Sequence, residues 1–233
     1  MNKIINYLLV GNMRLHWAKE ENNNYKFSHT SLEEPIPLNI KHDELIWASV
    51  GNYQTENLKK ENEITISDIN LKNLPKNFGI DRALCCISAL KIVNNPYKKN
   101  LLIADFGTTL SLTKIDAEGK LIGGQLIPGF LTQLKSMAEN TKNLNLPNNL
   151  VIPTNNFQLI TSKAMLKGVS NSLLGAIKLS FDSNSDILIV CGGDSALMGG
   201  HLNKSLGKVR IEPNLVMLGM IILQKNKSQL SNI

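Results

Sequence analysis

The sequence is poor in cysteine and aromatic residues and has no long apolar run. Its three cysteines, Cys85, Cys86 and Cys191, have the spacing of neither a disulfide framework nor a metal site. Reduced thiols of this kind are typical of a cytoplasmic protein. The longest apolar runs, at 101–104 and 187–191, are much shorter than the roughly 20 residues of a membrane-spanning helix. The sequence therefore predicts a cytoplasmic protein that does not span a membrane.

The chain carries a net charge of +6, yet its basic residues form no pattern suited to nucleic acid. The lysines are scattered and are not interleaved with aromatic side chains, so we expect a solvated basic surface and no nucleic-acid partner. An anionic substrate such as a nucleotide fits the same sign of charge. The length of 233 residues allows one large domain or two lobes of roughly 100 residues each.

The two halves of the chain begin with the same pattern, in which a strand, a glycine turn and a returning strand follow one another. The turns are Gly11-Asn12 and Gly107-Thr108. The flanking strands are expected at 4–10 and 14–18, and at 101–105 and 111–115. Further strands are expected at 45–50, 121–126 and 187–191, and helices at 81–93, after Pro128-Gly129, at 158–181 and after Pro213.

Strands and helices that alternate in two similar halves predict an α/β fold, with each half a sheet flanked by helices. We place the boundary between two lobes after residue 95, so that the lobes are residues 1–95 and 96–233. One glycine turn in each lobe suggests a cleft between them.

The second glycine turn carries the clearest chemical signal. Asp105 ends a buried strand, and Gly107 and Thr108 follow it. Glycine lets a backbone approach a phosphate closely, and successive amides form an anion-binding concavity. A carboxylate beside a bound phosphate needs a cation between the two, so Asp105 is a candidate metal ligand. The alternative is an ordinary hairpin.

Two other segments add to this signal. Gly192-Gly193-Asp194 follows a strand and can let a purine or ribose lie against the backbone, or is a plain turn capped by Asp194. Gly79-Ile80-Asp81-Arg82 begins a helix that Asp81 is expected to cap. Asp81 can accept a proton from an attacking hydroxyl in phosphoryl transfer, beside the cation of Arg82. The alternative is a helix cap with a surface arginine.

The order of these segments resembles type III pantothenate kinases, which belong to the actin, hexokinase and Hsp70-like ATPase superfamily. The resemblance covers essentially the whole chain and implies two ribonuclease H-like lobes. Other segments that carry it are Gly123-Gly124, Pro128-Gly129, Leu146-Pro147, Thr161 with Ala164 and Gly168, and Glu212-Pro213-Asn214-Leu215.

The resemblance implies that ATP phosphorylates the primary hydroxyl of pantothenate, giving 4'-phosphopantothenate in the first step of coenzyme A biosynthesis. Asp81 is the implied general base. The implied pantothenate-binding residues are Gly79, Ile80, Asp81, Arg82 and Thr161. Family members are homodimers, so a homodimer is expected.

The resemblance also implies the nucleotide and cation sites. Asp105 would be tied to a monovalent cation, K⁺ or NH₄⁺, and Mg²⁺ would accompany ATP. The candidate ATP-binding residues are Gly11, Asn12, Gly107, Thr108, Gly192 and Gly193.

The first turn departs from the family pattern, in which an aspartate precedes the glycine by two residues and a threonine follows the asparagine. Leu9 and Met13 stand in those places. The missing carboxylate would normally help to position the divalent metal of the nucleotide. A ligand-binding relative with impaired catalysis, a regulatory relative and a kinase for another small molecule are therefore alternatives.

The four histidines are scattered and show no ligand spacing. Each is expected at a surface or half-buried position; they are His16, His29, His42 and His201.

Overall fold

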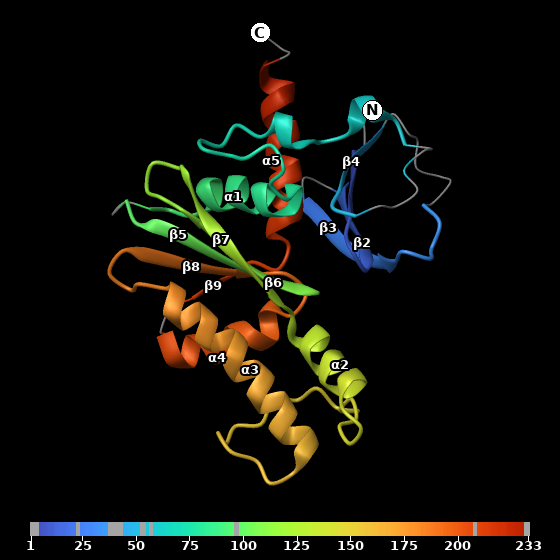
Figure 1. The fold of residues 1–233 in the computed structure, drawn as a ribbon. Helices are drawn as coiled ribbons and strands as arrows, with labels where there is room; N and C mark the ends of the chain where they lie inside the picture. The colour runs from blue at the N-terminus through green and yellow to red at the C-terminus, as the bar shows by residue number, and fades with distance from the viewer. Residues whose placement is uncertain are drawn as a thin grey trace. The chain divides into compact units, whose positions relative to one another are not determined.

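The computed structural model is a mixed α/β structure with two sheets, and it describes residues 5–21, 24–36, 44–51, 55, 58–95, 98–206 and 209–230 (Figure 1). The chain forms two compact units. The first comprises Met1–Asn94, Gly119–Leu121 and Asn214–Ile233, and the second comprises Asn95–Glu118 and Ile122–Pro213. All residues after 95 were expected in a second lobe, whereas Asn214–Ile233 belong to the first unit.

The first unit contains a four-stranded sheet with the order β3-β2-β1-β4. β1 pairs antiparallel with β2 and parallel with β4. β3 was not expected, because its polar sequence lacks the apolar residues that mark a strand. The strands are β1 (Asn6–Val10), β2 (Arg14–Glu21), β3 (Asn24–Ser31) and β4 (Leu45–Ser49).

Side chains alternate between the two faces of this sheet, and one face forms an apolar core. Leu8 and Val10 of β1 pack there with Leu15 and Trp17 of β2 and with Trp47 of β4. Residues after β4 form two short 3₁₀ helices, η2 (Lys60–Asn62) and η3 (Ile66–Asp68).

Two helices of the first unit, α1 (Ile80–Ile92) and α5 (Leu215–Leu230), pack against each other (Figure 1). The absence of a side chain at Gly219 lets the two backbones approach closely, since a Cβ there would stand 2.4 Å from the carbonyl oxygen of Leu84. This close packing on α1 joins the last helix to the first unit. The N-cap of α1 is Gly79, so the expectation that Asp81 caps the helix was wrong; Asp81 lies in the first turn.

The second unit contains a five-stranded sheet with the order β7-β6-β5-β8-β9. β5 pairs antiparallel with β6 and parallel with β8. The strands are β5 (Asn100–Phe106), β6 (Thr109–Ile115), β7 (Leu121–Pro128), β8 (Asp186–Cys191) and β9 (Arg210–Ile211).

Three helices complete the second unit, and their apolar sides bury one face of the sheet. Leu102 and Ala104 of β5 contact this core, which also takes in Leu134, Leu173 and Met198 from the helices. Among the described residues, no helix is both long and apolar enough to cross a membrane. The helices are α2 (Phe130–Asn140), α3 (Thr161–Ser180) and α4 (Ser195–Leu206).

A buried carboxylate, Asp186, closes one end of the second sheet. It accepts hydrogen bonds from Lys114 Nζ at 2.8 Å, Asn100 Nδ2 at 3.2 Å and the Asp182 backbone at 2.9 Å. Replacing Lys114 with methionine should lower the free energy of unfolding by about 3 kcal/mol, because the buried carboxylate loses its cation. Chemical denaturation measures this loss. The double variant with Asp186→Asn should recover part of it, and an equal loss in both variants would contradict the explanation.

Candidate active site

The Asp105 turn joins β5 to β6 in the second unit. Asp105 is half-buried, whereas Gly107 and Thr108 are exposed. The Gly107 backbone donates a hydrogen bond to Thr109 O at 3.3 Å, which closes the turn. The structure therefore presents an exposed glycine backbone with a carboxylate one residue inside the strand.

The paired glycines after β8 lie directly against this turn. β5 and β8 are parallel neighbours, with Asp105 opposite Cys191, so both strands end at the same edge of the sheet. A Cβ on Gly192 would stand 2.3 Å from Asp105 Oδ1 and 2.4 Å from Phe106 O. Gly192 also has a φ of +84°, which L side chains rarely adopt. The site thus needs glycine at position 192 for two independent reasons.

The start of α2 holds the other side of the Asp105 turn. Thr108 O accepts hydrogen bonds from the Gly129 backbone at 2.8 Å and from Thr132 Oγ1 at 2.7 Å. A Cβ on Gly129 would stand 2.0 Å from Gly107 O, so the two backbones are in direct contact. The amino terminus of a helix favours negative charge nearby. The turn is therefore fixed beside a terminus that suits a phosphate.

The donor groups at this edge fit a nucleotide and a hard cation. Gly193 is exposed, and open space surrounds the position of its absent Cβ. The Asp105 carboxylate offers oxygen, which is the ligand atom that Mg²⁺ and other hard cations prefer. These residues could hold the phosphates of a nucleotide together with a cation.

The first unit supplies a second candidate group at the start of α1. Burial raises the pKa of Asp81, although a hydrogen bond from the Arg82 backbone at 2.8 Å and the charge of Arg82 oppose this. The Arg82 guanidinium lies 4.1 Å from the centre of the Phe78 ring, which holds it in a cation–π contact. A partly desolvated carboxylate next to a fixed cation can act as a base towards an anionic alcohol.

The first glycine turn, between β1 and β2, is also in the first unit. The Gly11 backbone donates to Arg14 O at 3.0 Å, and Asn12 is exposed at the turn. Leu9, which stands where the resemblance implies an aspartate, is only 4% exposed, while Met13 is 60% exposed. Leu9 is thus a core residue and offers no metal ligand.

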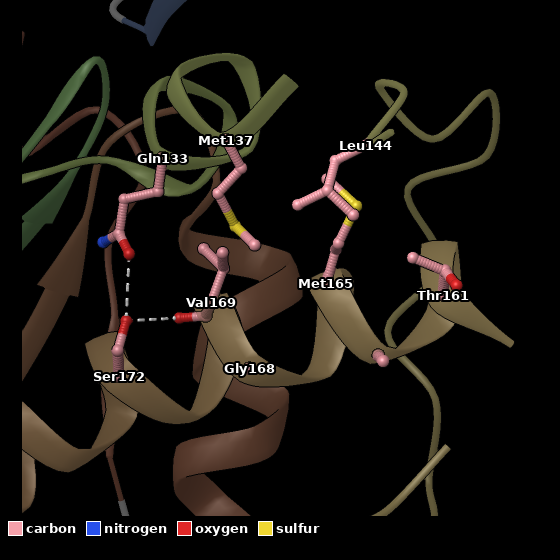
Figure 2. Close-up of a pocket in the computed structure, with 9 residues that line it drawn as sticks. Gln133, Met137, Leu144, Thr161, Met165, Gly168, Val169 and Ser172 are labelled. Atoms are coloured by element: carbon pink, nitrogen blue, oxygen red, sulfur yellow. Dashed lines mark hydrogen bonds between the residues drawn. The ribbon is translucent and has the colours of Figure 1, made fainter. Parts of the chain in front are cut away.

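Thr161 begins α3 and lines a cavity of about 430 Å³ between α2 and α3 (Figure 2). The lining is mostly apolar and includes Met137 and Met165. At the end of the cavity away from Thr161, Ser172 Oγ lies 3.1 Å from Gln133 Oε1 and donates to Val169 O at 2.8 Å (Figure 2). An apolar cavity with a few polar groups suits a small amphipathic molecule.

The structure brings some predicted residues together and leaves others apart. In the second unit, Asp105 lies against Gly192 and Gly107 lies against Gly129, whereas Thr161 lines the cavity on α3. The hydrogen bond from Thr132 was not predicted, because a single threonine in a sequence gives no signal of it. His16 and His29 were expected to be scattered, whereas they lie opposite each other on β2 and β3. His42 is outside the described residues.

Comparison with known proteins supports one family. Residues 44–182 match the family model of type III pantothenate kinases. A type III pantothenate kinase of Synechocystis is 28% identical over 229 residues, covering 91% of this chain and 87% of the relative. Another from Synechococcus is 31% identical over 169 residues, covering 67% of this chain and 66% of the relative.

Solved structures show the same fold at low sequence identity. A protein of Campylobacter jejuni, described as a transcriptional activator of the Baf family, has a TM-score of 0.70 at 18% identity. The match covers 97% of this chain and 100% of that one. The activator of 2-hydroxyisocaproyl-CoA dehydratase from Clostridium difficile, solved with ADPNP, has a TM-score of 0.56 at 10% identity, covering 99% and 98%. The fold is that of the actin- and hexokinase-like ATPases, and the chain belongs to the type III pantothenate kinase family.

Proposed function

We propose that this protein is an ATP-dependent pantothenate kinase. It transfers the γ-phosphate of ATP to the primary hydroxyl of pantothenate, giving 4'-phosphopantothenate and ADP, the first step of coenzyme A biosynthesis. The observation that carries the proposal is the desolvated carboxylate of Asp81, next to Arg82, in a chain that matches the family over residues 44–182. We further propose a cytoplasmic homodimer.

Asp81 is the proposed general base. The pantothenate hydroxyl attacks the γ-phosphorus, and Asp81 takes the hydroxyl proton as the bond to the ADP oxygen breaks. Burial raises the pKa of Asp81, which makes the carboxylate a stronger base than a solvated one. Arg82 is the proposed partner of the pantothenate carboxylate. Gly79 and Ile80 complete this binding segment, and Thr161 is the proposed pantothenate contact on α3.

The exposed glycine backbones are the proposed nucleotide contacts. In the second unit these are Gly107, Thr108, Gly192 and Gly193. In the first unit they are Gly11 and Asn12. Asp105 is the proposed ligand of K⁺ or NH₄⁺, and such cations, together with Mg²⁺, would neutralise phosphate charge during transfer. Leu9 supplies no carboxylate, so the first turn contributes to binding through its backbone and its polar neighbours.

Pantothenate-dependent release of ADP tests this function. The purified chain should release ADP when pantothenate is added to ATP with Mg²⁺ and K⁺ or NH₄⁺, and mass spectrometry should detect 4'-phosphopantothenate. Expression should also restore growth to a strain that lacks pantothenate kinase. Absence of product under every cation condition would reject the kinase assignment. Product from another alcohol alone would indicate a different small-molecule kinase.

A second candidate function is ligand binding without catalysis, and the burial of Leu9 favours it. In that case ATP or pantothenate raises the melting temperature while no product forms. A regulatory role would additionally require binding to a transcription protein or DNA. Thermal shift and product detection on the same sample separate these outcomes.

A further inference from the structure

His16 and His29 form a pair across β2 and β3 of the first sheet. Their Nδ1 atoms are 2.9 Å apart, and the ring centroids are 4.8 Å apart with planes at 77°. His16 is half-buried and His29 is exposed. A hydrogen bond needs one donor and one acceptor, so only one of the two Nδ1 atoms carries the shared proton.

The other nitrogen of His16 faces the first glycine turn. A Cβ on Gly11 would stand 3.1 Å from His16 Nε2 and 3.3 Å from His16 Cδ2. The Gly11 backbone therefore lies against the ring edge that carries Nε2. When His29 donates to Nδ1 of a neutral His16, the proton of His16 must be on Nε2, beside the turn.

The charge around this pair favours an anion over a metal ion. Burial is the main cause that lowers the pKa of His16, to about 4, followed by the charges of His29 and Arg14. Burial and Arg14 also lower the pKa of His29. On the neighbouring strand, the register partner of His16 is Leu9, which has no charge. A guanidinium repels a cation bound between the rings and attracts a phosphate.

More distant charges on this face come from α5 and from the end of β2. Lys225 of α5 lies 5.1 Å from the centre of the Tyr25 ring, and Glu20 is the register partner of Tyr25. The Glu20–Tyr25 pair, which Lys225 contacts, lies further along the hairpin than the His16–His29 pair. Arg14 is therefore the charged side chain that acts on both imidazoles.

We propose that His16 is a phosphate-binding residue of the first glycine turn and that His29 determines which nitrogen of His16 carries the proton; this proposal rests on the function proposed above. A phosphate at Gly11-Asn12 accepts a hydrogen bond from His16 Nε2. Because the anion stabilises a charged ring, phosphate binding shifts the titration of His16 to higher pH, and the protonated ring then donates from Nδ1 to His29. The family pattern has an aspartate at the position of Leu9, and that carboxylate would hold a metal beside the phosphate. In this chain the imidazole of His16 would instead supply a hydrogen-bond donor beside the turn.

Titration of the histidine ring protons by NMR tests this proposal on the full chain. The probe is inorganic pyrophosphate in the presence of EDTA, which removes divalent metals. Pyrophosphate should raise the titration midpoint of His16 by about one pH unit or more. An unmoved midpoint overturns the proposal, and this measurement needs no substitution that could disturb folding.

Substitutions of the two histidines test separately whether His16 binds the anion and whether His29 determines the position of the proton on His16. His16→Ala should weaken pyrophosphate binding by about tenfold, measured by calorimetry. His29→Phe should weaken it similarly, whereas His29→Asn, which keeps a hydrogen-bonding side chain, should stay within about threefold of the parent. Equal affinity in His16→Ala and the parent rejects the proposal. Equal losses in both His29 variants reject the positioning role.

This test and the test of the kinase can fail independently. Turnover of pantothenate with an unmoved midpoint would reject the role of His16 alone. A raised midpoint without turnover would reject the kinase and leave the phosphate site standing.

Discussion

Replacing Asp81 with asparagine is expected to lower kcat for pantothenate phosphorylation by about 10²- to 10⁴-fold. Asparagine keeps the shape of the side chain but cannot take the proton of the attacking hydroxyl. The KM for ATP should change little, because the proposed nucleotide contacts are other residues. A coupled assay of ADP release measures both constants. Turnover within threefold of the parent would remove Asp81 from the mechanism.

The same variant should be at least as stable as the parent. Burial raises the pKa of Asp81 above its ordinary value of 3.8. The stability from such a group is fully present below the unfolded-state pKa and is lost as pH rises through the folded-state pKa. At neutral pH the charged Asp81 therefore opposes folding, and asparagine removes that charge. The melting temperature of Asp81→Asn should equal or exceed that of the parent.

Asp68→Asn is the matched control, because the pKa of Asp68 shifts in the opposite direction. Burial alone would raise this pKa, but hydrogen bonds from Lys227 and Thr65 outweigh burial and lower it. Its stability is present above the unfolded-state pKa and is lost as pH falls through the folded-state pKa. Asp68→Asn should lower the free energy of unfolding by about 1 kcal/mol at neutral pH and leave kcat unchanged. Equal losses of activity in both variants would indicate a general structural effect.

The strands beside the two glycine turns and the long helix α3 followed from the sequence. The strands that flank the two glycine turns were predicted because apolar residues adjoin a glycine, and the structure has β1 with β2 and β5 with β6 there. The helix from 158 to 181 was also predicted; it begins three residues later, at Thr161. Such features depend on neighbours in the chain, which a single sequence displays directly.

The features that the sequence did not predict depend on contacts between distant residues. The pairing of β5 with β8 brings Gly192 against Asp105, and no local sequence pattern predicts that these two segments are adjacent. The packing of α5 on α1 likewise depends on the absence of a side chain at Gly219. His16 and His29 face each other because of the register of a hairpin whose second strand is polar. These placements are fixed by packing and register, which composition and periodicity do not encode.

Gly192→Ala is expected to lower the free energy of unfolding by about 2 to 4 kcal/mol, the sum of backbone strain and overpacking. Alanine at a φ of +84° is strained. Its Cβ would also stand 2.3 Å from Asp105 Oδ1 and 2.4 Å from Phe106 O, well inside contact distance. Either the turn after β8 or the end of β5 must move, so affinity for a non-hydrolysable ATP analogue should fall by at least about tenfold. Urea denaturation and calorimetry measure the two effects.

Gly193→Ala tests the proposed nucleotide contact without the clash that alanine causes at position 192. Nothing lies within 4 Å of a Cβ on Gly193, so the free energy of unfolding should stay within about 0.5 kcal/mol of the parent. If the exposed backbone of Gly193 contacts the nucleotide, its affinity for the ATP analogue should still fall, because the added methyl group occupies the approach. Equal stability losses at positions 192 and 193 would contradict the close packing of Gly192 on Asp105. Parent-like affinity in Gly193→Ala would move the nucleotide away from this turn and leave the packing argument intact.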